Sequence, residues 1–118
     1  MGTLIRVELW SDERAAADEA MQAVMDEMHR IDRAMSPVKP ESELSRINRS
    51  AAAQAVPLSE EMLRIIERSI HFSELSGGAF DITYASVGHL YDYRLGVRPA
   101  DSDIERARQA VGYRNLIV

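Results

Sequence analysis

Two segments of the chain, one near its start and one at its end, have the polarity pattern of β-strands. In segment 3–10, TLIRVELW, the odd-numbered side chains from Ile5 to Leu9 are all apolar, whereas the even-numbered ones include charged groups. This period of two predicts a strand with one buried face. Residues 113–118, YRNLIV, predict a second strand, in which the chain stops.

Between these segments, apolar residues recur every three or four positions, which predicts helices. The first helix is expected from Arg14 to about Ala34 and is ended by Pro37. A short helix is expected over 42–48, with Ser42 as its N-cap.

The second half of the chain predicts two more helices. One begins after Ser59, a good N-cap, and stops at Gly77. The other begins at the capping box Ser102–Glu105 and ends at Gly112. Residues 84–100 give no clear pattern.

These elements predict an α+β fold of antiparallel or mixed strands packed with amphipathic helices. Its strands would leave unpaired edges, so self-association through open strand edges is expected. The length of 118 residues suits one domain, 1–118.

The composition excludes several classes of function. The net charge is −5 and no basic stripe is interleaved with aromatic residues, so no nucleic-acid partner is expected. Cysteine is absent, which excludes disulfides and thiolate chemistry. His29, His71 and His89 lie far apart without ligand spacing, so we expect no metal site. No serine has a nucleophile motif, and no catalytic residue can be named.

The segment SGGAFDIT, residues 76–83, contains more than a helix end requires. In a structural interpretation, Gly77 is the left-handed residue after a helix, Gly78 adds a tight turn and Asp81 caps the next element. In a functional interpretation, the glycines bare backbone N–H groups to a ligand, Phe80 faces a flat ring, and Asp81 accepts a ligand hydrogen bond. The residues alone leave both open.

Several motifs, in order along the chain, resemble the ApbE family of FAD:protein FMN transferases. They are the opening MGT, the helix end MHRIDRAMS at 28–36, the run PESELSRIN at 40–48, SGGAFD at 76–81, and VGY at 111–113. The resemblance implies the amino-terminal portion of an ApbE-type (T-fold-like) domain, incomplete without its carboxyl-terminal part.

The resemblance also implies an activity. Family members transfer FMN from FAD, with Mg²⁺, to a threonine hydroxyl of a flavin-acceptor protein and release AMP, and full-length members are periplasmic or membrane-anchored. Neither a signal segment nor an apolar run long enough for a membrane span is seen. We expect Mg²⁺ from the missing carboxyl-terminal part and no activity from this chain alone. The alternatives are a non-catalytic flavin-binding or protein-interaction module, and an FAD pyrophosphatase.

Motif positions carry the expected FAD contacts onto this sequence. They are Met1, Val38, Ala79, Phe80 and Asp81. Val38 stands where the family often has an aromatic ring, so stacking is replaced by apolar contact and FAD affinity is expected to fall by about one or two decades. YASV at 84–87 also departs from the family's usual VGPL.

Overall fold

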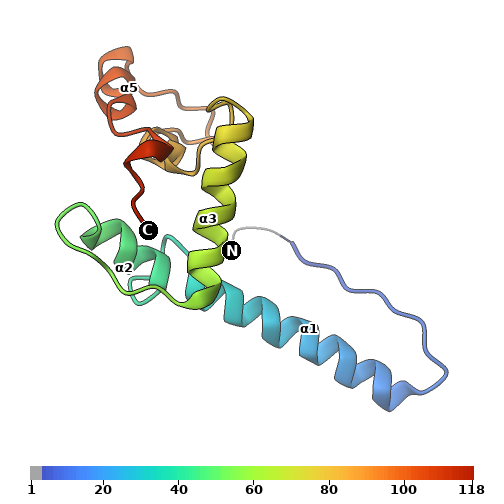
Figure 1. Cartoon of the computed structure of the whole chain (residues 1–118). Helices are drawn as coiled ribbons and strands as arrows, with labels where there is room; N and C mark the ends of the chain where they lie inside the picture. The colour runs from blue at the N-terminus through green and yellow to red at the C-terminus, as the bar shows by residue number, and fades with distance from the viewer. Residues whose placement is uncertain (1–3) are drawn as a thin grey trace. The chain divides into compact units, whose positions relative to one another are not determined.

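The structure is a computed structural model that describes residues 4–118 (Figure 1). The chain forms two compact units, the first ending at Pro57 and the second spanning Leu58–Val118. No helix formed by the described residues is both long and apolar enough to cross a membrane.

The first unit consists of an extended segment and two helices, α1 (Arg14–Met35) and α2 (Glu43–Ser50). Figure 1 shows the segment before α1 running alongside this helix in the opposite direction. Ile5 and Val7 are half-buried while Leu4 is 92% exposed, so the alternation seen in the sequence decides which side chains face inward.

Buried serine side chains join the end of α1 to the start of α2. The Ser42 hydroxyl is 1% exposed and donates to the Ser36 carbonyl at 2.6 Å, and the Ser45 hydroxyl donates to the same carbonyl at 3.2 Å. Ser42 Oγ also accepts from the Ser45 N–H at 3.0 Å, which confirms Ser42 as the N-cap of α2. The serines of the 40–48 motif therefore satisfy backbone groups that the tight turn would otherwise bury unpaired.

Charged side chains close the same turn on its exposed side. The Lys39 ammonium lies 2.5 Å from an Asp32 carboxylate oxygen, and this hydrogen bond is the largest cause of a pKa of Asp32 lowered to about 2. Arg49 donates to the carbonyl of Pro40 at 2.8 Å. Both contacts hold the proline-containing turn against a helix of the first unit.

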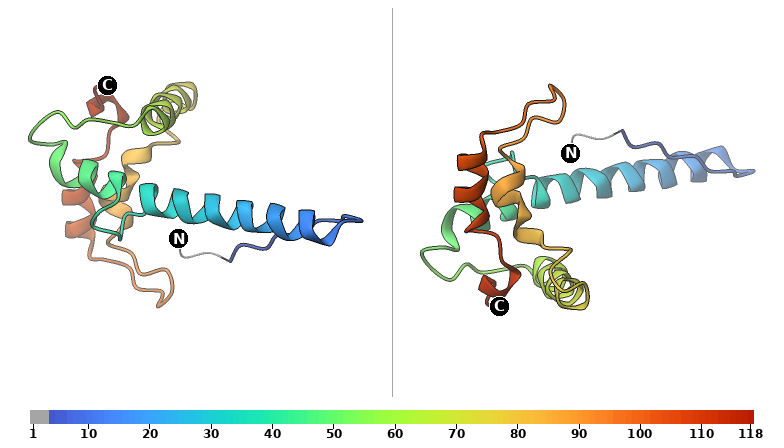
Figure 2. Two further views of the ribbon diagram at one scale, coloured as in Figure 1. Left: turned by 90° about the horizontal axis from the view of Figure 1, so that it is seen from below. Right: turned by 90° about the horizontal axis from the view of Figure 1, so that it is seen from above.

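The second unit is built of short elements around one longer helix. They are α3 (Glu60–Leu75), η1 (Ile82–Tyr84), α4 (Ala85–Gly88), α5 (Asp101–Arg108) and η2 (Tyr113–Asn115). α3 contacts η1 and η2, and α4 contacts η1 and α5. Figure 2 shows α5 beside the segment formed by η1 and α4.

The apolar core is small. Among residues 4–118, the buried apolar side chains are Met62 and Tyr113, at 4% and 7% exposure. Phe72 and Leu75 on α3 remain 46% and 69% exposed. Burial of so few large side chains stabilises a unit of this size only weakly, so hydrogen bonds between its loops contribute a large share of its order.

The prediction of an α+β fold with packed strands was wrong. Residues 4–118 form no sheet, and the described β structure is an isolated bridge between Asp92 and Val97. A strand is stabilised by hydrogen bonds to a neighbouring strand, and segment 4–10 has none in the described structure. In the predicted strand 113–118, the N–H groups of Asn115 and Leu116 instead bond three residues back, forming the turn η2. Self-association through strand edges therefore loses its structural basis.

Two helix boundaries also differ from prediction. α5 begins at Asp101, with Ala100 as its N-cap, so Ser102 lies inside the first turn and forms no capping box. A helix start at Asp101 is favoured over one at Ser102 because the Asp101 carboxylate accepts a hydrogen bond from Arg98 at 2.5 Å and lies at the positive end of the helix. α5 ends at Arg108, before the predicted Gly112, because residues 110 and 111 form tighter three-residue turns.

Candidate functional site

The glycine pair of segment 76–83 ends α3 in a Schellman motif. Gly77 and Gly78 have φ of 62° and 87°, the left-handed region that residues with a side chain rarely adopt. The Gly78 N–H donates to the Ser73 carbonyl at 2.8 Å, and the Gly77 N–H donates to the Glu74 carbonyl at 3.0 Å. The structural interpretation of both glycines is therefore confirmed.

The next backbone donors are engaged within the segment as well. The Ala79 N–H donates to the Ser76 carbonyl at 3.2 Å, and the Phe80 N–H donates to the Ser76 hydroxyl at 3.0 Å. Four consecutive N–H groups, from Gly77 to Phe80, thus already have acceptors. The prediction that the glycines bare N–H groups for a ligand was wrong, because the helix end and Ser76 use them.

Asp81 caps η1, as predicted, and it also makes contacts that the sequence did not reveal. Its Oδ1 accepts from the Thr83 N–H at 2.8 Å and from the Thr83 hydroxyl at 2.6 Å. Its Oδ2 accepts from the N–H of Tyr113 at 2.8 Å, and the Thr83 hydroxyl accepts from the N–H of Gly112 at 2.8 Å. We call these four bonds the Asp81–Thr83 clamp; they join segments about thirty residues apart.

The clamp determines the state of the Asp81 carboxyl. Partial burial raises the pKa of Asp81, but the hydrogen bonds from the Thr83 hydroxyl and from the N–H groups of Thr83 and Tyr113 outweigh it, so the pKa lies below the ordinary 3.8. A carboxylate has about four lone-pair positions, and the clamp uses three of them. One acceptor position, on Oδ2, is not used by the clamp.

The other predicted contact residues differ in their surroundings. Phe80 is 46% exposed and Ala79 is exposed, so both offer surface to a ligand next to Asp81. Val38 belongs to the first unit, where it lies in the turn after α1 and is 84% exposed. Met1 lies outside the described residues. The predicted contact residues of the second unit are therefore three consecutive residues, 79–81, and Val38 belongs to the other unit.

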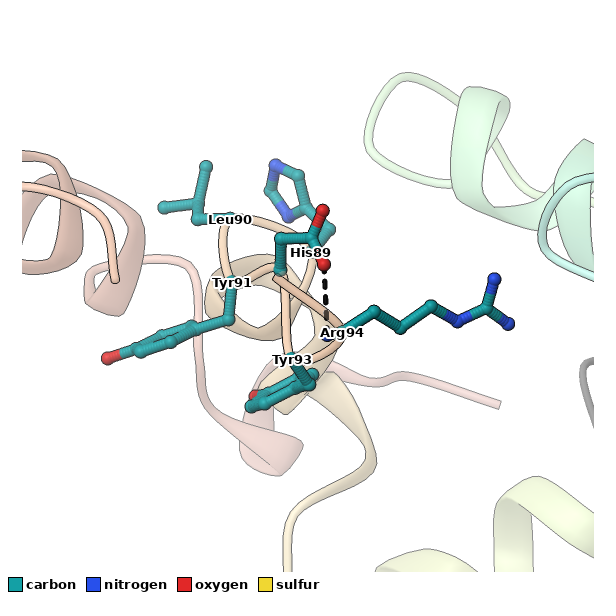
Figure 3. Close-up of a pocket in the computed structure, with 6 residues that line it drawn as sticks. His89, Leu90, Tyr91, Tyr93 and Arg94 are labelled. Atoms are coloured by element: carbon teal, nitrogen blue, oxygen red, sulfur yellow. Dashed lines mark hydrogen bonds between the residues drawn. The ribbon is translucent and has the colours of Figure 1, made fainter. Parts of the chain in front are cut away.

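A hollow of about 400 Å³ lies over the residues that follow α4, from His89 to Arg94 (Figure 3). The rings of Tyr91 and Tyr93 stack with centroids 5.6 Å apart, and the Asp92 carboxylate caps the turn through the Arg94 N–H at 3.0 Å. Figure 3 shows the Arg94 guanidinium pointing away from the tyrosines. The side chains do not converge on a common point, so this hollow has the geometry of a turn surface and not of a ligand site.

A buried glycine links this turn to η1. Tyr84 lies over Gly88, where an added Cβ would come within 2.6 Å of the Tyr84 ring. The Tyr84 hydroxyl is hydrogen-bonded to the Tyr93 hydroxyl at 3.1 Å, which raises the pKa of Tyr93. Through these contacts Tyr84 joins η1 to the turn that follows α4.

The described residues do not offer a metal site. Residues 4–118 contain no cluster of three His, Cys, Asp or Glu side chains that could hold a metal ion. No role for Mg²⁺ is therefore assigned to the side chains of this part of the chain.

Comparison with known proteins gives these motifs their context. The whole of residues 1–118 matches the ApbE family. The chain belongs to the ApbE family. It is 24% identical to an FAD:protein FMN transferase of Vibrio cholerae and 29% identical to one of Klebsiella pneumoniae, with all of this chain aligned to 37% and 35% of those proteins. The chain thus spans about a third of the length of these ApbE relatives.

Solved ApbE structures support the same assignment. The crystal structure of the ApbE protein of Thermotoga maritima superposes with a TM-score of 0.79 at 27% identity, covering 91% of this chain and 36% of that one. The apo flavinyl transferase ApbE of Pseudomonas stutzeri superposes with a TM-score of 0.67 at 21% identity, covering 89% of this chain and 34% of that one, and this likeness concerns the fold. The chain therefore has an ApbE-type arrangement despite the absence of a sheet in residues 4–118.

Sequence reasoning missed three partners of the ApbE-like SGGAFD segment. Thr83, Gly112 and Tyr113 were seen as parts of motifs but were given no role in the site. The spacing of about thirty residues hides their contact, since nothing in a local pattern shows that the turn before η2 returns to η1. The signal that could have found them is the polar pair Asp81 and Thr83, because two such groups in a half-buried turn need partners.

Proposed function

We propose that this chain contributes part of an FAD:protein FMN transferase, including part of its FAD site. The observation that carries the proposal is the ApbE match over residues 1–118, whose curated relatives are FAD:protein FMN transferases. In the reaction, a hydroxyl oxygen of the acceptor protein attacks the phosphorus nearest the riboflavin. The bond from that phosphorus to the bridging oxygen breaks, AMP leaves with that oxygen, and the hydroxyl proton is released.

The second unit supplies three features that suit FAD. The half-exposed Phe80 ring offers a flat apolar face, on which a base or an isoalloxazine ring can stack. The small side chain of Ala79 leaves room beside it. The remaining acceptor position of Asp81 Oδ2 suits a ribose hydroxyl or an amide N–H. Recognition would therefore combine one stacking face with one charged acceptor.

The other components of the reaction are expected from outside these side chains. We propose Mg²⁺ as the metal, held by the part of the ApbE fold that this chain does not match. The acceptor would be a protein with a threonine hydroxyl, and the full-length protein would be periplasmic or membrane-anchored.

An FAD titration of the 118-residue chain, followed by flavin fluorescence with and without Mg²⁺, tests the proposal. We expect saturable binding at micromolar FAD that does not depend on Mg²⁺. Absence of binding up to millimolar FAD would contradict a flavin site in this portion. Because no activity is expected from this chain alone, transfer and pyrophosphatase activity are distinguished in a chain of the relatives' full length, by whether FMN becomes attached to an added acceptor protein or stays free.

The chain offers a matched pair of variants for this titration. Phe80 and Phe72 are each 46% exposed, but only Phe80 lies in the proposed site. Loss of one stacked ring is expected to weaken FAD binding about tenfold or more in Phe80→Ala, whereas Phe72→Ala keeps the wild-type affinity. Equal effects of the two variants would show that the contact is not specific to segment 79–81.

A further inference from the structure

Thr83 has more bonds than the cap of a three-residue turn requires. Its N–H and its hydroxyl both donate to Asp81 Oδ1, at 2.8 and 2.6 Å, and its hydroxyl accepts from the Gly112 N–H at 2.8 Å. The Gly112 N–H can only donate, so Thr83 Oγ1 must be the acceptor there. The single hydroxyl proton must therefore point to Asp81, and the direction of each bond is fixed.

These hydrogen bonds fix the positions of the Asp81 and Phe80 atoms that would face a ligand. With both carboxylate oxygens of Asp81 held, by Thr83 on one side and by the Tyr113 N–H on the other, the one remaining lone pair on Oδ2 has a fixed direction. Phe80 precedes Asp81 directly, and its N–H is held by Ser76. Groups that are already in their bound geometry bind a ligand with less loss of conformational entropy.

We propose that Thr83 is a positioning residue for flavin binding, whose hydroxyl holds the Asp81 carboxylate and the adjoining Phe80 in the geometry that receives FAD. Thr83 acts through Asp81 and does not itself contact the ligand. This inference rests on the proposed function of the preceding section. The clamp would then contribute to FAD affinity as well as joining η1 to η2.

The variants Thr83→Val and Thr83→Ser separate the hydroxyl from the shape of the side chain. Valine has nearly the shape of threonine but leaves the Gly112 N–H without its acceptor, whereas serine keeps the hydroxyl. In FAD titrations of the 118-residue chain, we expect Thr83→Val to weaken binding about tenfold and Thr83→Ser to stay within about threefold of wild type. Ser102→Ala, which removes an exposed hydroxyl in α5, serves as the control.

Over the pH range in which circular dichroism shows the chain folded, the pH profile of FAD binding is a readout that a purely structural role would not move. Wild-type affinity should fall only as the pH drops through the lowered pKa of Asp81, below 3.8. In Thr83→Val the stabilising hydrogen bond is lost while burial remains, so the pKa rises and the fall begins at higher pH. The groups that set this behaviour are the Thr83 hydroxyl and the N–H groups of Thr83 and Tyr113, which oppose the effect of burial.

Asp81→Asn provides a second, independent variant. It has no carboxyl to titrate, so its profile should lack the acidic fall that the wild type shows, and protonation of FAD itself is common to both profiles. Far-UV circular dichroism measured in parallel shows whether each variant is folded. If Thr83→Val fails to fold, the FAD affinities and pH profiles of wild type, Thr83→Ser and Asp81→Asn still test the positioning role.

The outcomes separate this inference from the function on which it rests. If the wild type does not bind FAD, the proposed flavin site is wrong, and the positioning role is wrong with it. If the wild type binds but Thr83→Val has the same affinity and the same pH profile, only the positioning role is overturned. If wild type and Asp81→Asn have equal profiles, the Asp81 carboxylate takes no part in binding, and both the proposed acceptor contact and the positioning role are overturned. Weaker binding in Thr83→Val, recovery in Thr83→Ser and the shifted profile together support the inference.

Discussion

Replacing Asp81 by asparagine should loosen the contact between η1 and η2 by a predictable amount. The amide oxygen of asparagine can keep both bonds from Thr83, but its NH₂ group then faces the Tyr113 N–H, which is itself a donor. One bond to a charged acceptor is lost, and the N–H of a residue that is only 7% exposed is left unpaired. Such a loss costs about 2 kcal/mol in local stability.

Amide hydrogen exchange measures this cost where it arises. A loss of about 2 kcal/mol corresponds to roughly 30-fold faster exchange of the Tyr113 amide. Tryptophan fluorescence would miss the change, because Trp10 lies in the first unit and is fully exposed. Asp92→Asn is the matched control, since the Asp92 Oδ1 caps an exposed turn through two N–H groups and the amide oxygen can replace it.

The pH dependence of the same amide gives a second check. The pKa of Asp81 is lower in the folded chain than its ordinary value of 3.8, so its contribution is complete above that value and is lost as the pH falls through the folded pKa. The wild-type protection of Tyr113 should fall in this acidic window, and Asp81→Asn should lack that step. Tyr113 exchange in Asp81→Asn within about twofold of wild type would refute the clamp as a stabilising contact.

Two further substitutions test the helix ends. Gly77→Ala places a side chain on a left-handed residue at a cost of about 1–2 kcal/mol, so amide exchange at the end of α3 should accelerate. The control Gly96→Ala, at a residue with φ of 65° and equally open space, should loosen only its own turn. Faster α3 exchange in both variants would contradict this expectation. Ser42→Ala removes both the N-cap of α2 and a buried donor to the Ser36 carbonyl, which should lower the free energy of unfolding, measured by chemical denaturation, by about 1–3 kcal/mol. The exposed control Ser102→Ala should change this free energy by less than about 0.5 kcal/mol. A cost for Ser42→Ala as small as that of the control would contradict the buried network.

The sequence by itself determined the elements whose causes are local. The period of three to four apolar residues and the end at Pro37 predicted α1 almost to the residue. Ser42 and Ser59 predicted the starts of α2 and α3, because an N-cap acts within three residues of its own position. The glycine pair predicted the end of α3 for the same reason.

The tertiary structure decided everything that depends on a partner distant in the sequence. Segment 4–10 has the alternation of a strand, yet a strand needs a neighbour to receive its hydrogen bonds, and the described structure gives it none. The Gly112–Tyr113 turn returns to Asp81 and Thr83, so the polar atoms predicted for a ligand are mostly used by the chain itself. The local motif and the ApbE resemblance identified Asp81 as an important residue, but only the three-dimensional contacts show that three of its acceptor positions are used inside the fold.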